Sequence, residues 1–336
     1  MSEHKVPLDH WPALQGCPVQ RLAGGLINAT WQVGNPPRAV VQRLHHIFAP
    51  EVNEDIQAVT RHLQDRGMPT PTVLATADGS LSALDDKQRC WRALSWVPGR
   101  SYDTLQSAKM AAEAGQLVAR WHLATADLDH DFVFRRPAGH NTPVHMDKLR
   151  RALSDCTGHR LWDAVHELAE SIFSAWARWD GSLNQPLRLC HGDLKISNLR
   201  FTEAGEGLCL LDLDTLAMLP LDAELGDAWR SWCNPAGEDI EAAHFDLNLF
   251  ESSARAYISA SPPSREELES LPGGIERICL ELSSRFASDA LYENYFGWDE
   301  KVASGHGEHS LLRARGQFCL AGSVRAQRSD IEKILL

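Results

Sequence analysis

The segment from Leu189 to Asp214, LCHGDLKISNLRFTEAGEGLCLLDLD, constrains the possible fold more than any other part of the chain. Its pattern predicts a strand, a polar loop with the sequence HGDLKISN, a short strand over Leu199–Phe201, a turn, and a last strand over Leu208–Leu213. Because side chains alternate along a strand, we expect Asp212 and Asp214 to lie on the same side of its end, facing the polar loop. The chain must therefore bury apolar strands around a cluster of charged side chains.

The polar loop carries Asp193, Lys195 and Asn198. Carboxylates gathered in an apolar setting need a cation to hold them together. Transfer of a phosphoryl group explains this set best, because that reaction needs positioned groups and neutralised charge more than covalent work by the protein. We expect Asp193 to orient an acceptor hydroxyl and accept its proton, and Lys195 to lie beside the transferring phosphate. The hard oxygen ligands of Mg²⁺ are expected from Asn198, Asp212 and Asp214.

His191 begins the same loop. We expect it to be a buried group that holds the loop in place. A metal site that uses His191 and Asp193 as ligands is the weaker alternative, because their neighbours are oxygen and amine groups rather than His or Cys.

The chain changes from mostly strand to mostly helix near residue 97. Before that point the pattern predicts short strands and one helix over Pro50–Asp65. After it, helical stripes dominate, for example over Leu161–Trp176. We therefore expect an α+β, bilobal fold, with a small, mostly β N-terminal lobe over residues 1–97 and a larger, mostly helical C-terminal lobe over residues 98–336.

With these motifs the sequence resembles a known group, the aminoglycoside phosphotransferase and choline kinase-like family of small-molecule kinases. The family's HGDxxxxN loop is present from His191 to Asn198, and Leu211–Asp214 matches its I-D-x-[DE] motif. The segment from Gly115 to His122 resembles the family's LARLH helix, and residues 90–99 resemble its hinge between lobes. The resemblance covers most of the chain. It implies a protein-kinase-like fold, ATP and Mg²⁺, and a small hydroxyl compound as acceptor.

Several shorter segments resemble the N-acetylhexosamine 1-kinase branch of this family. That resemblance implies transfer to the anomeric hydroxyl of an N-acetyl hexosamine or a related sugar. An amino-compound acceptor, either an aminoglycoside or a choline-like molecule, is the alternative. A pseudokinase that binds nucleotide without catalysis is another, since Gln42 stands where kinases of this fold have a strand Lys. The segments are Val41–Leu44, Gly139–Pro143, Asp212–Thr215, Gly226–Arg230 with the following Glu238-Asp239, Tyr295–Gly297 and Arg313–Gln317.

The resemblance also implies a nucleotide site in the N-terminal lobe. Gln42 can donate hydrogen bonds but has no charge, so Arg43 or Lys195 would have to supply the positive charge. The Gly24-Gly25 pair forms either a plain turn or a cover for the phosphates, and Trp96 is placed to contact adenine. The expected nucleotide-binding residues are Gly24, Gly25, Asn28, Gln42, Arg43, Ser95, Trp96 and Val97.

The C-terminal lobe is expected to bind the acceptor. Asp227 and Arg230 lie one helical turn apart, so a plain surface ion pair is the alternative to an acceptor contact. The loop from His140 to Thr142 could equally be a cap for the helix that follows. The expected acceptor-binding residues are His140, Asn141, Thr142, Asp227, Arg230 and Arg313.

The composition excludes several classes of partner. The chain has 336 residues, with 45 acidic residues against 33 Lys and Arg and a formal net charge of −12. We expect neither nucleic acid nor an anionic membrane as partner, because both favour clustered basic residues. No apolar run is long enough for a membrane span and no signal-peptide core is present, so we expect a cytoplasmic protein. The eight cysteines contain no CxxC pair, and we expect buried, reduced thiols.

Overall fold

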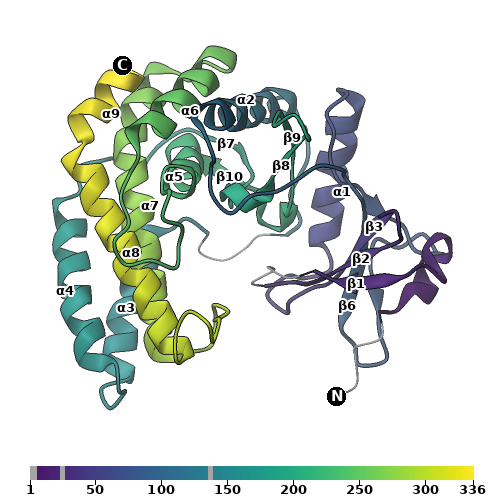
Figure 1. Cartoon of the computed structure of the whole chain (residues 1–336), viewed down its shortest axis with the longest axis horizontal. Helices are drawn as coiled ribbons and strands as arrows, with labels where there is room; N and C mark the ends of the chain where they lie inside the picture. The colour runs from purple at the N-terminus through teal and green to yellow at the C-terminus, as the bar shows by residue number, and fades with distance from the viewer. Residues whose placement is uncertain (1–5, 23–26, 135–138) are drawn as a thin grey trace. The chain divides into compact units, whose positions relative to one another are not determined.

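The computed structural model describes residues 6–22, 27–134 and 139–336 (Figure 1). The chain divides into two compact units. The first comprises Met1–Gly99 and Asp127–Arg136, and the second comprises Arg100–Ala126 and Pro137–Leu336. The division at Gly99 lies just beyond the expected lobe boundary, and residues 127–136 return to the first unit.

The first unit is built on an antiparallel sheet with one long helix. The strand order is β1-β2-β3-β6-β4, and β5 pairs with β6 outside this path. Helix α1, Val52–Asp65, closely matches the expected helix. The strands are β1 (Val19–Arg21), β2 (Ala29–Val33), β3 (Ala39–Arg43), β4 (Val73–Leu74), β5 (Ala83–Leu84) and β6 (Cys90–Ser95), preceded by the short 3₁₀ turns Leu8–His10 and Pro12–Leu14.

One face of this sheet forms the core of the first unit. Trp31, Val41 and Trp91 come from the three neighbouring strands β2, β3 and β6, and they pack with Trp11 and Leu14 from the 3₁₀ turns. Because side chains alternate along a strand, the residues between them point to the opposite face. The core therefore leaves the second face of the same strands for polar side chains.

The second unit is mostly helical, as expected. Helix α7 packs against α8, α5, α3 and α4, and in Figure 1 it runs beside α8 over much of its length. Ser264 and Glu267 form a reciprocal capping box at the start of α7, which satisfies its first backbone N–H groups. The helices are α2 (Ala108–Thr125), α3 (Thr142–Asp155), α4 (Trp162–Arg178), α5 (Leu221–Trp232), α6 (Leu247–Ala260), α7 (Arg265–Tyr292), α8 (His306–Ala326) and α9 (Arg328–Leu335).

Helices α5 and α7 approach each other closely at two glycines. A Cβ atom on Gly274 would lie 2.3 Å from the Asp222 carbonyl oxygen, and one on Gly226 would lie 2.8 Å from the Gly274 carbonyl oxygen. Real Cβ atoms do not occupy such positions, so both glycines permit the crossing. This contact places α5 against the buried centre of the second unit.

Two short antiparallel two-stranded sheets in the second unit carry the polar loop. Strand β7 (Leu187–Cys190) pairs with β10 (Ala217–Pro220), and β8 (Leu199–Phe201) pairs with β9 (Gly207–Leu210). The expected last strand was too long, because β9 ends at Leu210. Beyond it the backbone turns, so strand alternation does not set where Asp212 and Asp214 point.

The eight cysteines are all free thiols. Cys190, Cys209, Cys233 and Cys279 are buried, whereas Cys319 is exposed. The expectation of buried thiols therefore holds for only part of the set.

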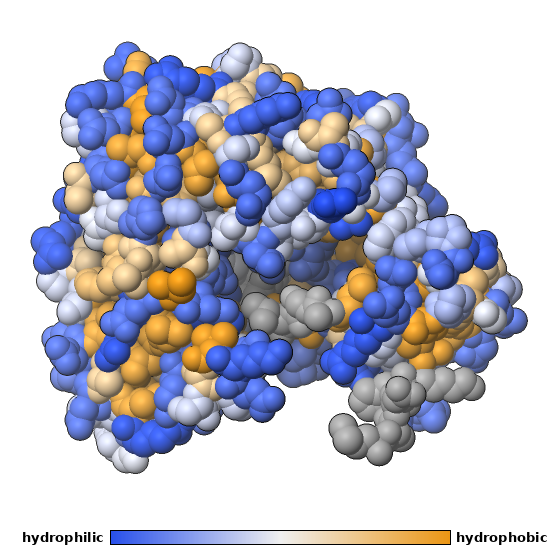
Figure 2. Space-filling view, in the orientation of Figure 1, coloured by the Kyte–Doolittle hydropathy of each residue, from blue (hydrophilic) through white to orange (hydrophobic). Residues whose placement is uncertain are grey.

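The surface is mixed in character. On the face shown in Figure 2, hydrophobic side chains lie in small groups between hydrophilic ones. Within the described ranges, none of the helices combines the length and the apolar character that crossing a membrane would need.

Candidate active site

The polar loop is held from beneath by one helix. The His191 and Gly192 backbone N–H groups donate to the two carboxylate oxygens of Glu224 on α5, at 2.8 and 2.9 Å. The buried His191 ring donates from Nε2 to the Leu211 carbonyl oxygen at 2.7 Å, so it joins the loop to the end of β9. The expectation that His191 is a buried structural group is confirmed.

Gly192 is required at its position for two reasons. Its φ is +77°, in the left-handed region that favours glycine. A Cβ atom there would also lie 2.4 Å from the Thr215 carbonyl oxygen. The loop can therefore turn sharply between β7 and the 3₁₀ turn Ile196–Asn198.

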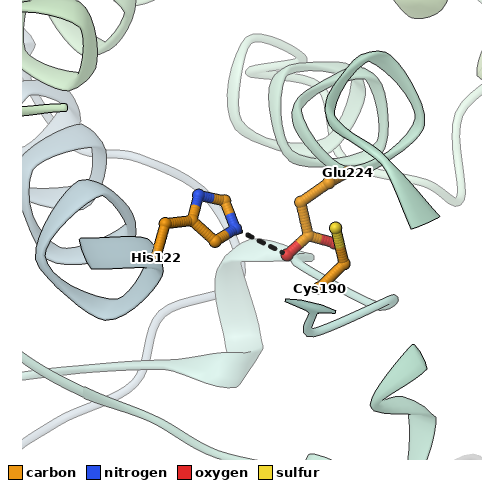
Figure 3. Close-up of side chains that lie close together, drawn as sticks. All are labelled: His122, Cys190 and Glu224. Carbon is orange, nitrogen blue, oxygen red and sulfur yellow. Dashed lines mark ion pairs between the residues drawn. The ribbon is translucent and has the colours of Figure 1, made fainter. Parts of the chain in front are cut away.

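Glu224 is itself held by a buried His. Figure 3 shows His122 from α2, Cys190 from β7 and Glu224 from α5 pointing toward one another. The His122 Nε2 atom lies 3.4 Å from Glu224, too far for a strong hydrogen bond, so their attraction is mainly electrostatic. The other ring nitrogen of His122 lies 2.8 Å from the Tyr257 hydroxyl. A buried chain of polar groups thus runs from Tyr257 to the polar loop.

The same three side chains are close enough to hold a metal ion, since their ligand atoms lie within 4.8 Å of one another. Their chemistry opposes this. Both oxygens of Glu224 already accept backbone N–H groups. The Cys190 thiol is engaged as well, because it donates to the Leu219 carbonyl oxygen at 3.4 Å. We therefore interpret this cluster as structural.

Asp193, Lys195 and Asn198 come together as expected. The Lys195 ammonium lies 2.9 Å from Asp193 Oδ2. The Asn198 amide donates to the same oxygen at 3.1 Å and to the Asp193 carbonyl oxygen at 2.8 Å. Because the amide nitrogen of Asn198 is engaged in this way, its oxygen is the end that can bind a cation.

The charges of Asp193 and Lys195 are mutually dependent. Burial by itself would raise the pKa of Asp193, but the adjacent Lys195 ammonium, with His191 and Arg230, lowers it well below its usual value. Burial would lower the pKa of Lys195, and Asp193 and Asp212 raise it instead. Asp193 is therefore an ionised carboxylate at neutral pH. Such a group orients an acceptor hydroxyl strongly and is a weak proton acceptor, which suits a loose phosphoryl-transfer transition state.

Asp212 adopts an unusual backbone conformation. Its φ and ψ are 61° and 57°, a left-handed conformation that costs a non-glycine residue about 1–2 kcal/mol. It is the residue before a 3₁₀ turn, Leu213–Thr215, that contains the buried Asp214. Strain of this kind is typical of functional positions, where the surrounding structure holds it.

The donor set fits the Mg²⁺ expected from the sequence. Asn198, Asp212 and Asp214 offer only oxygen ligands, which this hard cation prefers. Bound there, Mg²⁺ would supply positive charge to neutralise phosphate oxygens. The negative charge of Asp212 contributes to the raised pKa of Lys195, so Asp212 acts electrostatically on the polar loop.

Asp227 and Arg230 form an ion pair, but a buried one rather than a surface one. The Arg230 Nη2 atom lies 2.8 Å from Asp227 Oδ1, and Nη1 lies 2.5 Å from Glu238 Oε1. Burial lowers the pKa of Arg230, and the two carboxylates more than reverse this effect. The second Asp227 oxygen, Oδ2, is buried and has no hydrogen-bond partner in the described part of the chain.

His140 and Thr142 both bind Glu281 on α7. His140 Nδ1 lies 3.1 Å from Glu281 Oε1, and the Thr142 hydroxyl donates to Oε2 at 2.7 Å. Asn141 accepts from the Val144 backbone N–H at 3.4 Å and caps α3. The loop from His140 to Thr142 therefore caps α3, which is one of the two roles that the sequence left open.

Glu281 and His140 are charged partners. Burial would raise the pKa of Glu281, but the hydrogen bond and charge of His140, with His145 and Arg285, lower it to about 2. Burial would lower the pKa of His140, and Glu281 and Asp227 raise it instead. The influence of Asp227 on His140 places the loop next to the buried ion pair of α5.

Arg313 on α8 is buried and bound at both ends of its guanidinium group. Nε donates to Asp239 Oδ1 at 2.6 Å, and Nη1 donates to the Gly297 carbonyl oxygen at 2.9 Å. His309 binds the same Asp239 oxygen at 2.8 Å. Asp239 directly follows Glu238, which binds Arg230. Two adjacent carboxylates therefore hold the two buried arginines, Arg230 and Arg313.

Three carboxylates hold these groups: Glu224, Asp239 and Glu281. Sequence reasoning missed Glu224 and Glu281, and it included Asp239 only within a segment resemblance. Each lies far along the chain from the residues that it binds. Glu224 and Glu281 stand in helices whose residues are buried on almost every side. Both helices carry several other charged residues, so the sequence gives no signal that singles out Glu224 or Glu281.

The expected nucleotide-binding residues lie in the first unit. Asn28 accepts from the His45 backbone N–H at 2.9 Å, and the Ser95 hydroxyl accepts from the Thr72 backbone N–H at 2.9 Å. Trp96 and Val97 follow β6 directly, and the Trp96 backbone N–H donates to the Arg38 carbonyl oxygen at 3.2 Å. Gln42 and Arg43 end β3. Gly24 and Gly25 lie outside the described residues.

The fold and this site agree with one family. The chain belongs to the phosphotransferase enzyme family, whose sequence profile matches residues 18–258. It is therefore a small-molecule kinase that transfers phosphate to hydroxyl acceptors. A comparison with curated protein sequences found no significant match.

Solved structures show the same fold over nearly the whole chain. An aminoglycoside phosphotransferase from Alicyclobacillus acidocaldarius is 17% identical with a TM-score of 0.59, and the match covers 98% of each chain. A choline/ethanolamine kinase family protein from Mesorhizobium loti is 18% identical with a TM-score of 0.59, covering 97% of each chain. An amicoumacin kinase in complex with AMP-PNP, Ca²⁺ and its ligand is 13% identical with a TM-score of 0.59, covering 91% of this chain and 88% of that one. The expected α+β, protein-kinase-like fold is confirmed.

Proposed function

We propose that this protein is an ATP- and Mg²⁺-dependent kinase that phosphorylates the anomeric hydroxyl of an N-acetyl hexosamine. The observation that carries the kinase chemistry is the contact of Asp193 with Lys195 and Asn198. Asp193 orients the acceptor hydroxyl, Lys195 neutralises charge on the transferring phosphate, and Asn198 binds Mg²⁺ with Asp212 and Asp214. We assign nucleotide binding to residues 1–97 and acceptor binding to residues 98–336.

The charges on the acceptor side support a hydroxyl-rich acceptor. Arg230 is flanked by Asp227 and Glu238, and His140 is paired with Glu281. Each of these cations is held by at least one carboxylate, so hydrogen-bond donors and acceptors lie close together, and a polyhydroxyl compound can bind both kinds of group.

The resemblance of several segments to hexosamine 1-kinases supports the anomeric position. The anomeric hydroxyl is more acidic than the other ring hydroxyls. A carboxylate whose pKa is lowered, as that of Asp193 is, accepts protons weakly and therefore suits the most acidic hydroxyl available. The buried Asp227 Oδ2 atom can accept a second hydroxyl or the amide N–H of an N-acetyl group.

An amino-compound acceptor is the second candidate. The similar solved structures are named as an aminoglycoside phosphotransferase and a choline/ethanolamine kinase family protein. The same Asp227 Oδ2 atom could accept from an ammonium group. A kinase for such acceptors would retain the roles of Asp193 and Asn198.

The test is ATP consumption over a panel of N-acetyl hexosamines, free sugars, choline, homoserine and aminoglycosides. We expect an N-acetyl hexosamine to be consumed and its methyl glycoside to be inert, because the 1-O-methyl group removes the proton that Asp193 accepts. Phosphorus NMR of the product should show coupling to the anomeric proton. A 6-phosphate product, or equal turnover of the methyl glycoside, would contradict the anomeric assignment. Turnover of only amino compounds would favour the second candidate.

A further inference from the structure

Lys195 lies between two backbone hydrogen bonds that come from helix α5. The Trp232 indole N–H donates to the Leu194 carbonyl oxygen at 2.7 Å. The Ser231 hydroxyl accepts from the Ile196 backbone N–H at 3.1 Å. These two backbone atoms belong to the peptide groups on either side of Lys195, and the residues that bind them are the last two of α5. One helix end therefore holds the backbone of Lys195 on both sides.

The same face of α5 holds the first part of the polar loop. Glu224, which accepts from the first two backbone N–H groups of the loop, precedes Ser231 by seven residues, or two helical turns. Residues with this spacing lie on one face of a helix, about 10 Å apart along its axis. One face of α5 thus binds the backbone of the polar loop both before and after Asp193.

Alternate residues of the polar loop face α5 and the accessible side. Leu194 and Ile196, whose backbone atoms bind α5, are buried. The side chains of Asp193 and Lys195 are each 30% exposed and pair with each other at 2.9 Å. This pair, like the hydrogen bonds from the Asn198 amide to Asp193, joins residues of the loop only. The contacts with α5, in contrast, fix the loop to the helices of the second unit.

We propose that Ser231, together with Trp232, is a positioning residue for Lys195, so that the Lys195 ammonium meets the transferring phosphate while it is paired with Asp193. The proposal rests on the proposed function, because it presumes that Lys195 neutralises charge on that phosphate. A Lys side chain is a point charge on a flexible four-carbon stem, so its placement depends on how firmly its backbone is held. A displacement of about 1 Å in a reacting group costs up to about a hundredfold in rate.

The first measurement is amide hydrogen exchange in the free protein. We expect Ser231→Ala to speed exchange in peptides that contain residues 194–198, because the Ile196 N–H loses its acceptor, and to leave exchange in α7 unchanged. Ser231→Thr keeps a hydroxyl and should restore the protection. Ser252→Ala is the matched control, because its half-buried hydroxyl donates to the Asn248 carbonyl oxygen within its own helix, α6. It should not change exchange in the polar loop.

The second measurement is a double-mutant cycle on the release of phosphate from Mg²⁺–ATP without any acceptor. Radiolabelled ATP makes the rates of slow variants measurable. We expect Ser231→Ala to lower this rate about tenfold, with the Kd of ATP and the melting temperature within error of the parent, and Ser231→Thr to restore it. In a Lys195→Ala background, Ser231→Ala should change the rate by less than about twofold, because the group that it positions is absent.

Three results would overturn the proposal. A rate for Ser231→Ala within about twofold of the parent would show that the hydroxyl does not matter for transfer. Faster exchange throughout the chain with a lowered melting temperature would show a purely structural role. An equal loss with and without Lys195 would show that Ser231 acts on another group, and it would leave the proposed function standing if Lys195→Ala is itself slow. A Lys195→Ala variant as fast as the parent would instead remove Lys195 from the proposed function.

Discussion

At the scale of single residues, neighbouring groups set the charge and the orientation of each side chain in the candidate site. Asp193 is ionised because the Lys195 ammonium outweighs the effect of burial on its pKa. Asn198 presents its oxygen outward because its nitrogen is bound to Asp193. Gly192 allows the turn that puts these groups in place. Each role thus depends on a contact within a few residues of the loop.

Replacing Asp193 by Asn should test this arrangement most directly. The variant keeps the size of the side chain and removes its charge, so it should fold normally and lose about 10²–10⁴ in turnover. Steady-state kinetics with the consumed acceptor and thermal unfolding measure both effects. Asp147→Asn, the same change at an exposed position on α3, is the control and should keep normal turnover. Turnover of Asp193→Asn within about twofold of the parent would remove Asp193 from the mechanism.

At the scale of elements, helices α5 and α7 position both halves of the second unit's site. Glu224 on α5 holds the backbone of the polar loop, and Glu281 on α7 holds His140 and Thr142. The close crossing at Gly274 brings these two helices together. A change in that crossing should therefore affect stability and the site at once.

Gly274→Ala should destabilise the protein although alanine favours helices. Glycine inside a helix costs roughly 1 kcal/mol relative to alanine, but a Cβ at Gly274 would lie 2.3 Å from the Asp222 carbonyl oxygen. The backbone would have to shift, at a cost of about 1–3 kcal/mol or more, so overpacking outweighs propensity. Gly322→Ala on α8, where a Cβ meets nothing within 4 Å, should instead raise the free energy of unfolding. Denaturant unfolding compares the two, and a stabilised Gly274→Ala variant would contradict the crossing.

The pair of His140 and Glu281 should make stability depend on pH. The folded-state pKa of His140 is raised, so its contribution is fully present below its ordinary value of 6.5 and is lost as pH rises through the raised value. The pKa of Glu281 is lowered to about 2, so its contribution is present above its ordinary value of 4.5 and is lost as pH falls. The pair therefore stabilises most between those limits.

Thermal unfolding of the parent and of His140→Gln across pH measures this contribution. The difference in melting temperature should be largest near about pH 5.5 and should shrink as the pH rises through the raised pKa of His140. His145→Gln, at a site 3.9 Å from the same carboxylate, is a weaker version of the same change. A difference that grows with rising pH would contradict the assignment.

At the scale of the whole molecule, the chain combines two units with separate cores. The first unit buries one face of its sheet against the two 3₁₀ turns, and the second buries α7 among neighbouring helices. The expected ligands of Mg²⁺, including Asp212, belong to the second unit, and the expected nucleotide contacts belong to the first.

Mg²⁺ and ATP together should stabilise the protein against heat. A ligand present at about a hundred times its dissociation constant adds about 2.7 kcal/mol, so a rise in melting temperature is expected with Mg²⁺–ATP. Chelation of Mg²⁺ should remove most of this rise and abolish turnover. Asp212→Ala should have the same effect as chelation, whereas Asp147→Ala should not. An unchanged Mg²⁺-dependent rise in Asp212→Ala would show that Asp212 is not a ligand.

What the sequence determined by itself was local pattern and residue chemistry. The helix that became α1, the strand–loop–strand segment of the polar loop and the contact of Asp193 with Lys195 and Asn198 all follow from spacing within a short stretch. Periodicity and turn residues act over a few positions, so they can be recognised without the fold. The same reasoning extended the last strand too far, because the turn at Asp212 is a strained conformation that propensity disfavours.

Only the tertiary structure decided which distant side chains hold the site. Glu224 binds the polar loop, Glu281 binds His140, and Ser231 binds the backbone next to Lys195, although the partners are far apart in the sequence. It also made the pair of Asp227 and Arg230 a buried one. The physical reason is that burial and charge pairing depend on how helices and strands pack, and the pKa of a buried group depends on its neighbours in space rather than in the chain.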